Sequence, residues 1–252
     1  YFRGLSFRTI LFMNSDFQKV NNLTGWAVFN IALIVYWITM EPTASYWDCG
    51  EFIAVSYKLE VPHPPGAPLF LLIGRMFSFL AFGEESQVAY WINFSSALAG
   101  AFTSMFLFWS TVLFGRKLMK IRTPQELTTD RTWVLMGAGL VAALSFTFSD
   151  SAWFSNVEAE VYAMSSFFTA FVVWAMLKWD LIEDEAKANR WLILIFYMMG
   201  LSIGVHLLNL VTIPALALIY YFKKYNPGPW GIVATMLVSL FIIFFINNLI
   251  IP

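Results

Sequence analysis

The residues best suited to chemistry lie in TASYWDCGEFIAVSYKLEVPHPPGAP, residues 43–68, between two strongly apolar stretches. Asp48 and Glu51 are three positions apart, which places both carboxylates on one face of a helix. One carboxylate can then act as a general base, while the other orients a substrate or binds a cation. Ordinary acids on a solvated loop are the alternative. The aromatic residues around the pair favour a position at a membrane interface instead.

The stretch PHPPGAP, residues 62–68, predicts a stiff connection that leads into a helix. Pro68 suits the first turn of that helix, because the missing N–H does no harm there. The free N–H groups of the helix start would form an anion site, phosphate included, with His63 beside them. A rigid turn without a ligand is the alternative. Arg75, further along the same helix, could neutralise a phosphate or reach lipid headgroups.

The composition indicates a membrane protein. Hydrophobic residues make up 59% of the chain and charged residues only 12%, whereas soluble domains carry about a quarter charged residues. The 15 Lys and Arg are scattered and form no basic stripe, so nucleic acid is not an expected partner. The single cysteine, Cys49, excludes an internal disulfide and argues against a structural zinc site.

We therefore predict an all-α polytopic membrane protein that forms a single membrane domain over residues 1–252. About seven stretches are long and apolar enough to span a bilayer. They begin near Gly25, Val88, Thr132, Glu158, Trp191, Leu207 and Trp230. Residues 66–82 are short for a crossing and contain Arg75, so they are expected to form a surface or re-entrant helix. Residues 1–24 are expected to be a cytoplasmic segment, and residues 41–87 an external loop that carries the candidate site.

Positive charges set this orientation, since they gather in cytoplasmic loops. They lie before the first span and after the second, at Arg3, Arg8, Lys19, Arg116, Lys117, Lys120, Arg122 and Arg131. Both groups can be cytoplasmic only if residues 66–82 do not cross. The external face then gathers Asp48, Glu51, His63, Asp150, Glu158, Glu160 and His206. Ionisable groups beside spans usually mark a wet cavity.

Several of these residues have simpler roles available. Glu158 and Glu160 would favour the positive end of a helix dipole, and Asp150 could cap a helix. His206 could be a hydrogen-bonded packing residue. At this point we do not choose among Asp150, Glu158 and Glu160.

The segment DCGEFIAVSYKLEVPHPPGAPLF resembles the signature of a known family: an acid, Gly-Glu, a helical spacer and His-Pro-Pro-Gly. The layout is similar to that of GT-C glycosyltransferases. More narrowly, it resembles polytopic membrane proteins common in Bacteroidetes, long classed as a domain of unknown function and related to the animal transmembrane O-mannosyltransferase of plexin-type receptors. Members of that family continue well past this length, so the chain is expected to be a short or partial member.

The resemblance implies transfer of a hexose, perhaps mannose, from a polyprenyl-phosphate donor to a Ser or Thr hydroxyl of an exported protein. It implies Asp48 as the base and Glu51 as its assistant or a sugar ligand. It implies that His63 meets the donor phosphate and that one of Asp150, Glu158 and Glu160 joins the site. Arg75 and His206 are further candidates, from their own positions, for binding substrate or donor phosphate. No metal is expected to be required, although a divalent cation could help. The expected location is the bacterial cytoplasmic membrane, with the site facing the periplasm.

Two other functions stay open on the sequence alone. One is a transporter or flippase of a lipid-linked or anionic solute, for which a matching second half would be typical. The other is a non-catalytic membrane subunit that holds partners of an envelope complex together.

Overall fold

Long apolar helices form most of the chain. The structure, a computed structural model, describes residues 15–121, 123 and 126–250, and in these residues all regular elements are helical. The long helices are α2 (Ser15–Thr39), α5 (Val88–Leu118), α6 (Thr129–Thr147), α8 (Val161–Asp180), α9 (Glu185–Ile203), α10 (Ile213–Lys224) and α11 (Pro229–Phe245). The predicted all-α fold class is confirmed.

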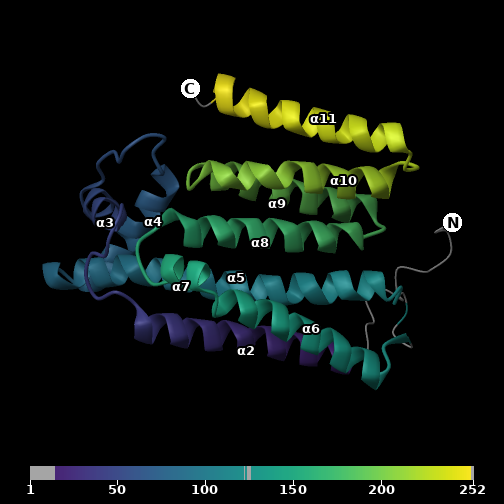
Figure 1. Ribbon diagram of the computed structural model, residues 1–252, viewed down its shortest axis with the longest axis horizontal. Helices are drawn as coiled ribbons and strands as arrows, with labels where there is room; N and C mark the ends of the chain where they lie inside the picture. Colours follow the sequence, from purple (N-terminus) through teal and green to yellow (C-terminus); the bar gives the residue numbers. More distant parts are fainter. Residues whose placement is uncertain (1–14, 122, 124–125, 251–252) are drawn as a thin grey trace.

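The long helices lie side by side, and successive ones run in opposite directions (Figure 1). We call the end where α2 stops and α5 starts the site end. The short helices α3 (Cys49–Lys58) and α4 (Pro68–Ser78) lie there, followed by the 3-10 turns η1 (Phe79–Ala81) and η2 (Glu85–Gln87). The apolar helix of α4 and η1 is too short to span a bilayer. Helix α2 ends and α5 begins at the same end of the bundle (Figure 1), which fits the prediction that residues 66–82 do not cross.

Five helical stretches in the described residues are long and apolar enough to cross a membrane, or six if α6 and α7 (Asp150–Asn156), which are bent by 64°, form one span. This is fewer than the seven predicted. The helix expected to start near Trp191 exists as α9, but its first two turns carry Glu185, Lys187 and Arg190. These charges leave too little apolar length for α9 to qualify.

Helix α2 begins earlier than predicted. It starts at Ser15, so residues 15–24 are part of the helix; that residues 1–24 are cytoplasmic stays a prediction. Phe17 is 4% exposed and belongs to the same buried cluster as Val112 and Leu135, so the packed face of the helix extends to its first turn. Residues 1–14, with Arg3 and Arg8, and Arg122 lie outside the described residues.

Basic residues gather at the end of the bundle opposite the site. Lys117, in the last turn of α5, pairs with Asp180 at 2.6 Å. The Lys223 Nζ donates to the carbonyl of Trp179, in the last turn of α8, and to that of Ile182, just past its end. Lys223 therefore satisfies carbonyls at the C-terminal end of α8, and Lys117 pairs with an acid at the same end. Their clustering at one end agrees with the predicted orientation of the loops.

Helix α5 is the centre of the bundle, since 61% of its span is buried inside the structure, against 6% for α11. It packs against α2, α4, α6 and α8. Small residues allow this close approach; a Cβ on Gly100 would lie 2.3 Å from the Asn156 side chain. The contact fixes α7 and the loop after it, residues 157–160, against α5.

Candidate active site

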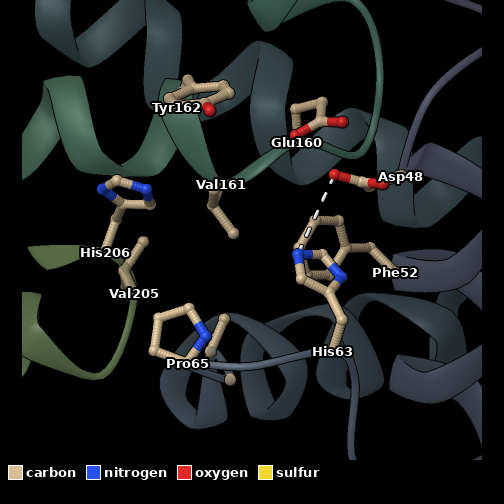
Figure 2. Close-up of a pocket in the computed structure, with 11 residues that line it drawn as sticks. Asp48, Phe52, His63, Pro65, Glu160, Val161, Tyr162, Val205 and His206 are labelled. Atoms are coloured by element: carbon tan, nitrogen blue, oxygen red, sulfur yellow. Dashed lines mark ion pairs between the residues drawn. The ribbon is translucent and has the colours of Figure 1, made fainter.

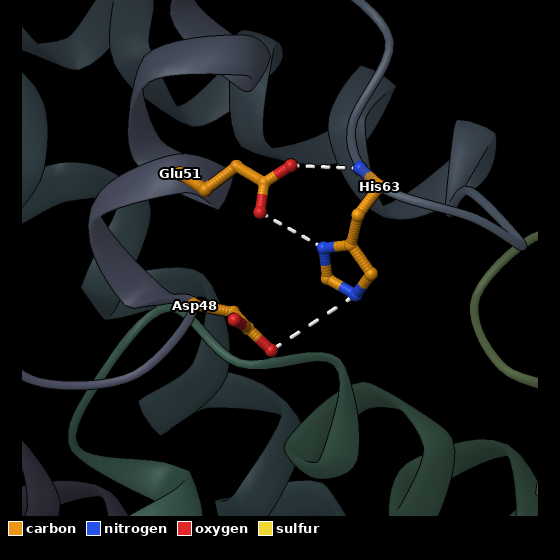
Figure 3. Close-up of polar contacts among 3 residues, drawn as sticks. All are labelled: Asp48, Glu51 and His63. Carbon is orange, nitrogen blue, oxygen red and sulfur yellow. Dashed lines mark hydrogen bonds and ion pairs between the residues drawn. The ribbon is translucent and has the colours of Figure 1, made fainter.

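Asp48, Glu51 and His63 form one polar cluster at the site end (Figure 3). Asp48 is the N-cap residue of α3 and Glu51 lies in its first turn. Glu51 accepts a hydrogen bond from the backbone N–H of His63 at 2.7 Å, and its second oxygen lies 2.8 Å from His63 Nδ1. His63 Nε2 lies 4.0 Å from the Asp48 carboxylate. The imidazole thus bridges the two acids that the sequence paired.

The cluster favours a charged histidine. The Glu51 carboxylate raises the pKa of His63 above its usual value, and the charges of Asp48 and Glu160 add to this effect. In return, the hydrogen bonds from His63 lower the pKa of Glu51. Because Glu51 holds Nδ1, the free ring edge with Nε2 is presented to Asp48 and the space beside it.

A small cavity of about 70 Å³ opens next to this cluster (Figure 2). Asp48 and His63 line one side, together with Glu160, the residue before α8. Tyr162 and His206 line the opposite side. The cavity therefore gathers side chains from the loop after α2, the start of α8 and the turn after α9.

Glu160 is the most deeply placed acid of the cavity. It is only 5% exposed. Burial raises its pKa to about 7, and the nearby charges of Asp48 and Glu158 contribute. A carboxyl group with this pKa can exchange a proton near neutral pH. Asp48 and Glu160 thus form a pair of acids in different environments, one exposed and one buried.

Glu158 lies beside the cavity rather than in its lining. It is 1% exposed, and burial raises its pKa, an effect that the Ser45 hydroxyl partly offsets. Its Oε1 has no hydrogen-bond partner among the described residues. Of the three acids left open by the sequence, Glu160 is the one that lines the cavity.

His206 closes the far side of the cavity with a defined orientation. Its Nδ1 accepts a hydrogen bond from the backbone N–H of Leu208 at 3.1 Å. Burial lowers the pKa of His206, which favours the neutral ring. The proton of that ring is then on Nε2. Its ring lies 5.4 Å from that of Tyr162, so the two form one wall.

Four predicted site residues lie outside the cavity lining: Glu51 and Glu158, described above, and Arg75 and Asp150. Arg75 donates to the backbone carbonyl of Tyr57 at 2.6 Å and lies over the rings of Tyr57 and Phe79, so it ties α4 to the end of α3. Asp150 is exposed at the start of α7.

The start of α4 is less open than the sequence suggested. Pro68 occupies the first turn as predicted. However, the N–H of Leu69 donates to the Gly204 carbonyl at 2.7 Å. This bond fastens α4 to the turn after α9 and uses one of the N–H groups that an anion would need. Gly66 and Ala67 still line the cavity.

One residue of the site, Asn93, was not predicted from the sequence. It fixes the backbone that leads into α3. Asn93 is fully buried on α5, and its Nδ2 donates to the carbonyls of Glu41 and Thr43. Its Oδ1 lies 3.9 Å from the Cys49 sulfur. These contacts anchor the chain that leads into α3 and thereby place Asp48. The available signal was a polar amide inside an apolar span.

The residues 200–204, GLSIG, fit the G-x-S-x-G pattern of hydrolase nucleophiles. Ser202 is buried within α9, however, and donates its hydroxyl proton to the Met199 carbonyl. A nucleophile of this class sits on an exposed strand-to-helix turn. The structure therefore gives this pattern no catalytic role.

A cation could be held by Asp48, Glu51 and His63, whose potential ligand atoms lie within 4.8 Å of one another. Carboxylate oxygens and an imidazole suit several divalent metals. The hydrogen bonds between Glu51 and His63 already satisfy two of these groups without a metal. That no metal is required stays a prediction.

Comparison with known proteins identifies a family whose match includes this site. Residues 48–228, more than two thirds of the chain, match the model of the protein O-mannosyl-transferase TMEM260 N-terminal domain. The chain belongs to this family. The match begins at Asp48 and includes all the residues that line the cavity. The family recognised from the short signature is thereby confirmed over most of the chain.

Two curated relatives carry the same name. The chain is 31% identical to the protein O-mannosyl-transferase tmem260 of Dictyostelium discoideum over 58% of its own length and 16% of that protein. It is 28% identical to TMEM260 of Mus musculus over 74% of its own length and 23% of that protein. The chain thus spans about a quarter or less of these relatives. No solved structure matches it.

Proposed function

We propose that the chain carries the catalytic membrane part of a protein O-mannosyltransferase. It would move a hexose, mannose by the names of its relatives, from a polyprenyl-phosphate donor to a Ser or Thr hydroxyl of an exported protein. One observation carries this proposal: the family match covers the whole cavity in which Asp48, His63, Glu160 and His206 meet. The donor class follows from the GT-C-like layout of the loop after the first span.

In this proposal Asp48 is the general base. Its carboxylate is exposed at the mouth of the cavity, where an acceptor hydroxyl can reach it. The acceptor oxygen attacks the anomeric carbon, its proton passes to Asp48, and the bond from that carbon to the phosphate oxygen breaks. The bonding electrons leave with the phosphate. Glu51 acts indirectly, because it orients His63 and keeps it charged.

The leaving phosphate would lie at the amino end of α8, between His206 and Glu160, the N-cap residue of that helix, which has to be protonated to avoid repelling the phosphate. There α8 begins at Val161, a 20-residue helix whose amino end carries a partial positive charge. The Nε2–H of His206 is a further donor on this wall, and charged His63 lies at the edge nearest Asp48. These groups would stabilise the negative charge that develops on the departing oxygen.

We further propose that the protein is a multi-pass protein of the bacterial cytoplasmic membrane with its site end facing the periplasm. Five to six membrane-capable helices support the membrane location. The basic residues at the opposite end support the orientation. The bacterial setting rests on the resemblance of the Asp48 to Gly66 signature to bacterial members of the family.

The experiment compares exported proteins from cells that carry the wild-type chain, Asp48→Asn or Asp130→Asn. Asp130 is an exposed acid in the first turn of α6, at the end away from the site, and serves as the matched control. Mass spectrometry should find Ser and Thr residues that lose a single hexose with Asp48→Asn only. Losing a general base lowers rates by about 10²–10⁴-fold.

Immunoblots and thermal unfolding verify that all three chains are made and folded. The proposal fails if hexose levels do not depend on the chain. Solute flux without a covalent product would instead indicate a transporter. Loss of a membrane complex in the absence of the chain, with Asp48→Asn fully functional, would indicate a scaffold.

A further inference from the structure

One polar side chain points away from the bundle in the middle of a membrane span. Asn30 is exposed on α2, whose apolar span runs from Asp16 to Thr39. At 1.5 Å per residue, Asn30 lies about 4 Å from the midpoint of that span. The hydrocarbon core extends about 15 Å to either side of the midpoint, and the side chain of asparagine is too short to reach the membrane surface. In a bilayer, the amide of Asn30 therefore lies at the depth of the hydrocarbon.

The hydrogen-bonding capacity of Asn30 is only partly used. Its Nδ2 donates to the Trp26 carbonyl, one turn earlier in α2, at 2.7 Å. The second N–H and the Oδ1 have no hydrogen-bond partner within the described residues. Polar groups without partners are costly in hydrocarbon, and amides inside spans commonly bond to a neighbouring helix. The position of Asn30 therefore indicates contact with protein rather than with lipid.

The face of α2 around this amide has the spacing of a helix–helix contact. Helix α2 forms one edge of the bundle and α11 the opposite edge (Figure 1). One face of α2 packs inward through three fully buried residues: Val28, Ala32 and Tyr36. The opposite face has exposed residues at alternating intervals of four and three, as in a coiled-coil seam: Leu23, Ala27, Asn30 and Ile34. We call this face the α2 seam. Ala27 is small and allows a second helix to approach closely.

A second copy of the same helix is complementary to this seam. An asparagine amide has donors and an acceptor, so two Asn30 side chains at the same depth can bond to each other in both directions. Within the described residues, the other exposed amides of the spans lie closer to a membrane surface: Asn22, Gln87, Asn247 and Asn248. Copies inserted in the same orientation are related by a two-fold axis along the membrane normal, which places identical residues at identical depth.

We propose that the α2 seam joins two copies of the chain into a dimer within the membrane, with Asn30 bonded to the partner's Asn30. The proposal does not depend on the proposed function, since it uses none of the site residues. Both copies have the same orientation, so their two candidate sites open on the same side of the membrane. Residues 40–47 connect the seam helix directly to Asp48 in each copy.

Disulfide trapping tests where two copies meet. Ile34→Cys places a thiol on the seam one turn from Asn30, and Val141→Cys on α6 is the matched control; the native side chains are 55% and 68% exposed. The natural Cys49 is fully buried and does not compete. Two differently tagged copies are produced in the same cells, and their membranes are oxidised. We expect a disulfide-linked product with both tags from Ile34→Cys only. Equal linking of Val141→Cys would show random collision and would overturn the proposal.

Variants of Asn30 test the role of the amide. Chains with donor or acceptor dyes on an N-terminal tag are mixed in lipid vesicles, and energy transfer is measured over a range of protein-to-lipid ratios. Loss of the interhelical hydrogen bonds should weaken association about tenfold in Asn30→Leu, whereas Asn30→Gln keeps an amide and should still associate. Asn248→Leu is the matched control, because Asn248 is also exposed and bonds to the carbonyl four residues earlier. It should associate like the wild type.

Each outcome decides the proposal. Asn30→Leu makes α2 more apolar, so the variant is expected to insert and fold, and thermal unfolding verifies this. A wild type that stays single at every protein-to-lipid ratio would show that a second copy does not cover the seam. Energy transfer in Asn30→Leu equal to that of the wild type would show that the amides do not meet. Ala27→Trp should reduce both energy transfer and the Ile34→Cys product, and two undiminished signals would refute contact at the seam.

Discussion

Replacing Glu160 by glutamine should stabilise the protein, and only at high pH. Glu160 is 5% exposed, and burial raises its pKa to about 7 from a usual value of 4.5. The folded state therefore holds this proton more tightly than the unfolded state. Stability contributed by the protonated group is present at low pH and is lost as pH rises through 7. Keeping the ionised group buried costs about 3 kcal/mol well above pH 7.

The size of the effect can be worked out between two practical pH values. From pH 5 to pH 8 the wild type should lose about 2.5 kcal/mol of unfolding free energy through this one group. Glu160→Gln keeps the shape of the protonated acid and removes the titration, so its advantage should be small at pH 5 and large at pH 8. Unfolding in mild detergent, followed by tryptophan fluorescence at both pH values, measures it. Glu85→Gln, an exposed acid at the same end, is the control.

A constant difference between Glu160→Gln and the wild type at pH 5 and pH 8 would refute this reasoning. It would mean that Glu160 ionises freely in the folded state, or that the charge of His63 offsets the cost of burial.

Further predictions follow from the same contacts. NMR of the two histidines should show that the pKa of His63 is above its usual value and that of His206 below it. Glu51→Gln should lower the pKa of His63 and leave that of His206 unchanged. A pKa of His63 that does not respond to Glu51→Gln would contradict the pairing. Gly100→Ala should cost about 1–3 kcal/mol of stability, because the new Cβ meets a buried side chain at 2.3 Å, whereas Gly137→Ala, where nothing lies within 4 Å, should be neutral or gain up to about 1 kcal/mol. Hexose transfer should persist in a strong chelator; complete loss that one divalent cation restores would show that the acid and histidine cluster binds a metal.

The sequence predicted the membrane fold because its signals act over long stretches. The length of the apolar stretches predicts the helices, and the positions of the basic residues predict which helix ends lie on the same side of the membrane. Small errors in helix boundaries change neither prediction. The early start of α2 escaped prediction because it depends on one tertiary contact, that of Phe17 with the core. Helix α9 begins at Glu185, six residues before the predicted start near Trp191, because its first turns carry three charged residues that the sequence pattern placed in a loop.

The candidate site was only partly predictable, since distant contacts build it. Spacing alone paired Asp48 with Glu51. His63 lies twelve positions beyond Glu51, and the chain returns there only because Leu59 ends α3 in a left-handed conformation, with φ at 55°. Leucine rarely adopts this conformation, so the sequence gives no sign of the reversal. Likewise, the placing of Glu160 depends on the 64° bend between α6 and α7.

The two buried acids, Glu158 and Glu160, are evidence that the cavity has a function beyond packing. Glu158 and Glu160 are both at most 5% exposed, and burial raises the pKa of each. Groups that weaken the fold when ionised are expected where proton transfer or substrate binding requires them. Glu160→Gln should therefore gain stability and lose activity: its unfolding free energy at pH 8 is higher than that of the wild type, and it transfers hexose more slowly. A variant that gained stability and kept full transfer would assign Glu160 to packing alone and leave Asp48 as the only acid needed in the cavity.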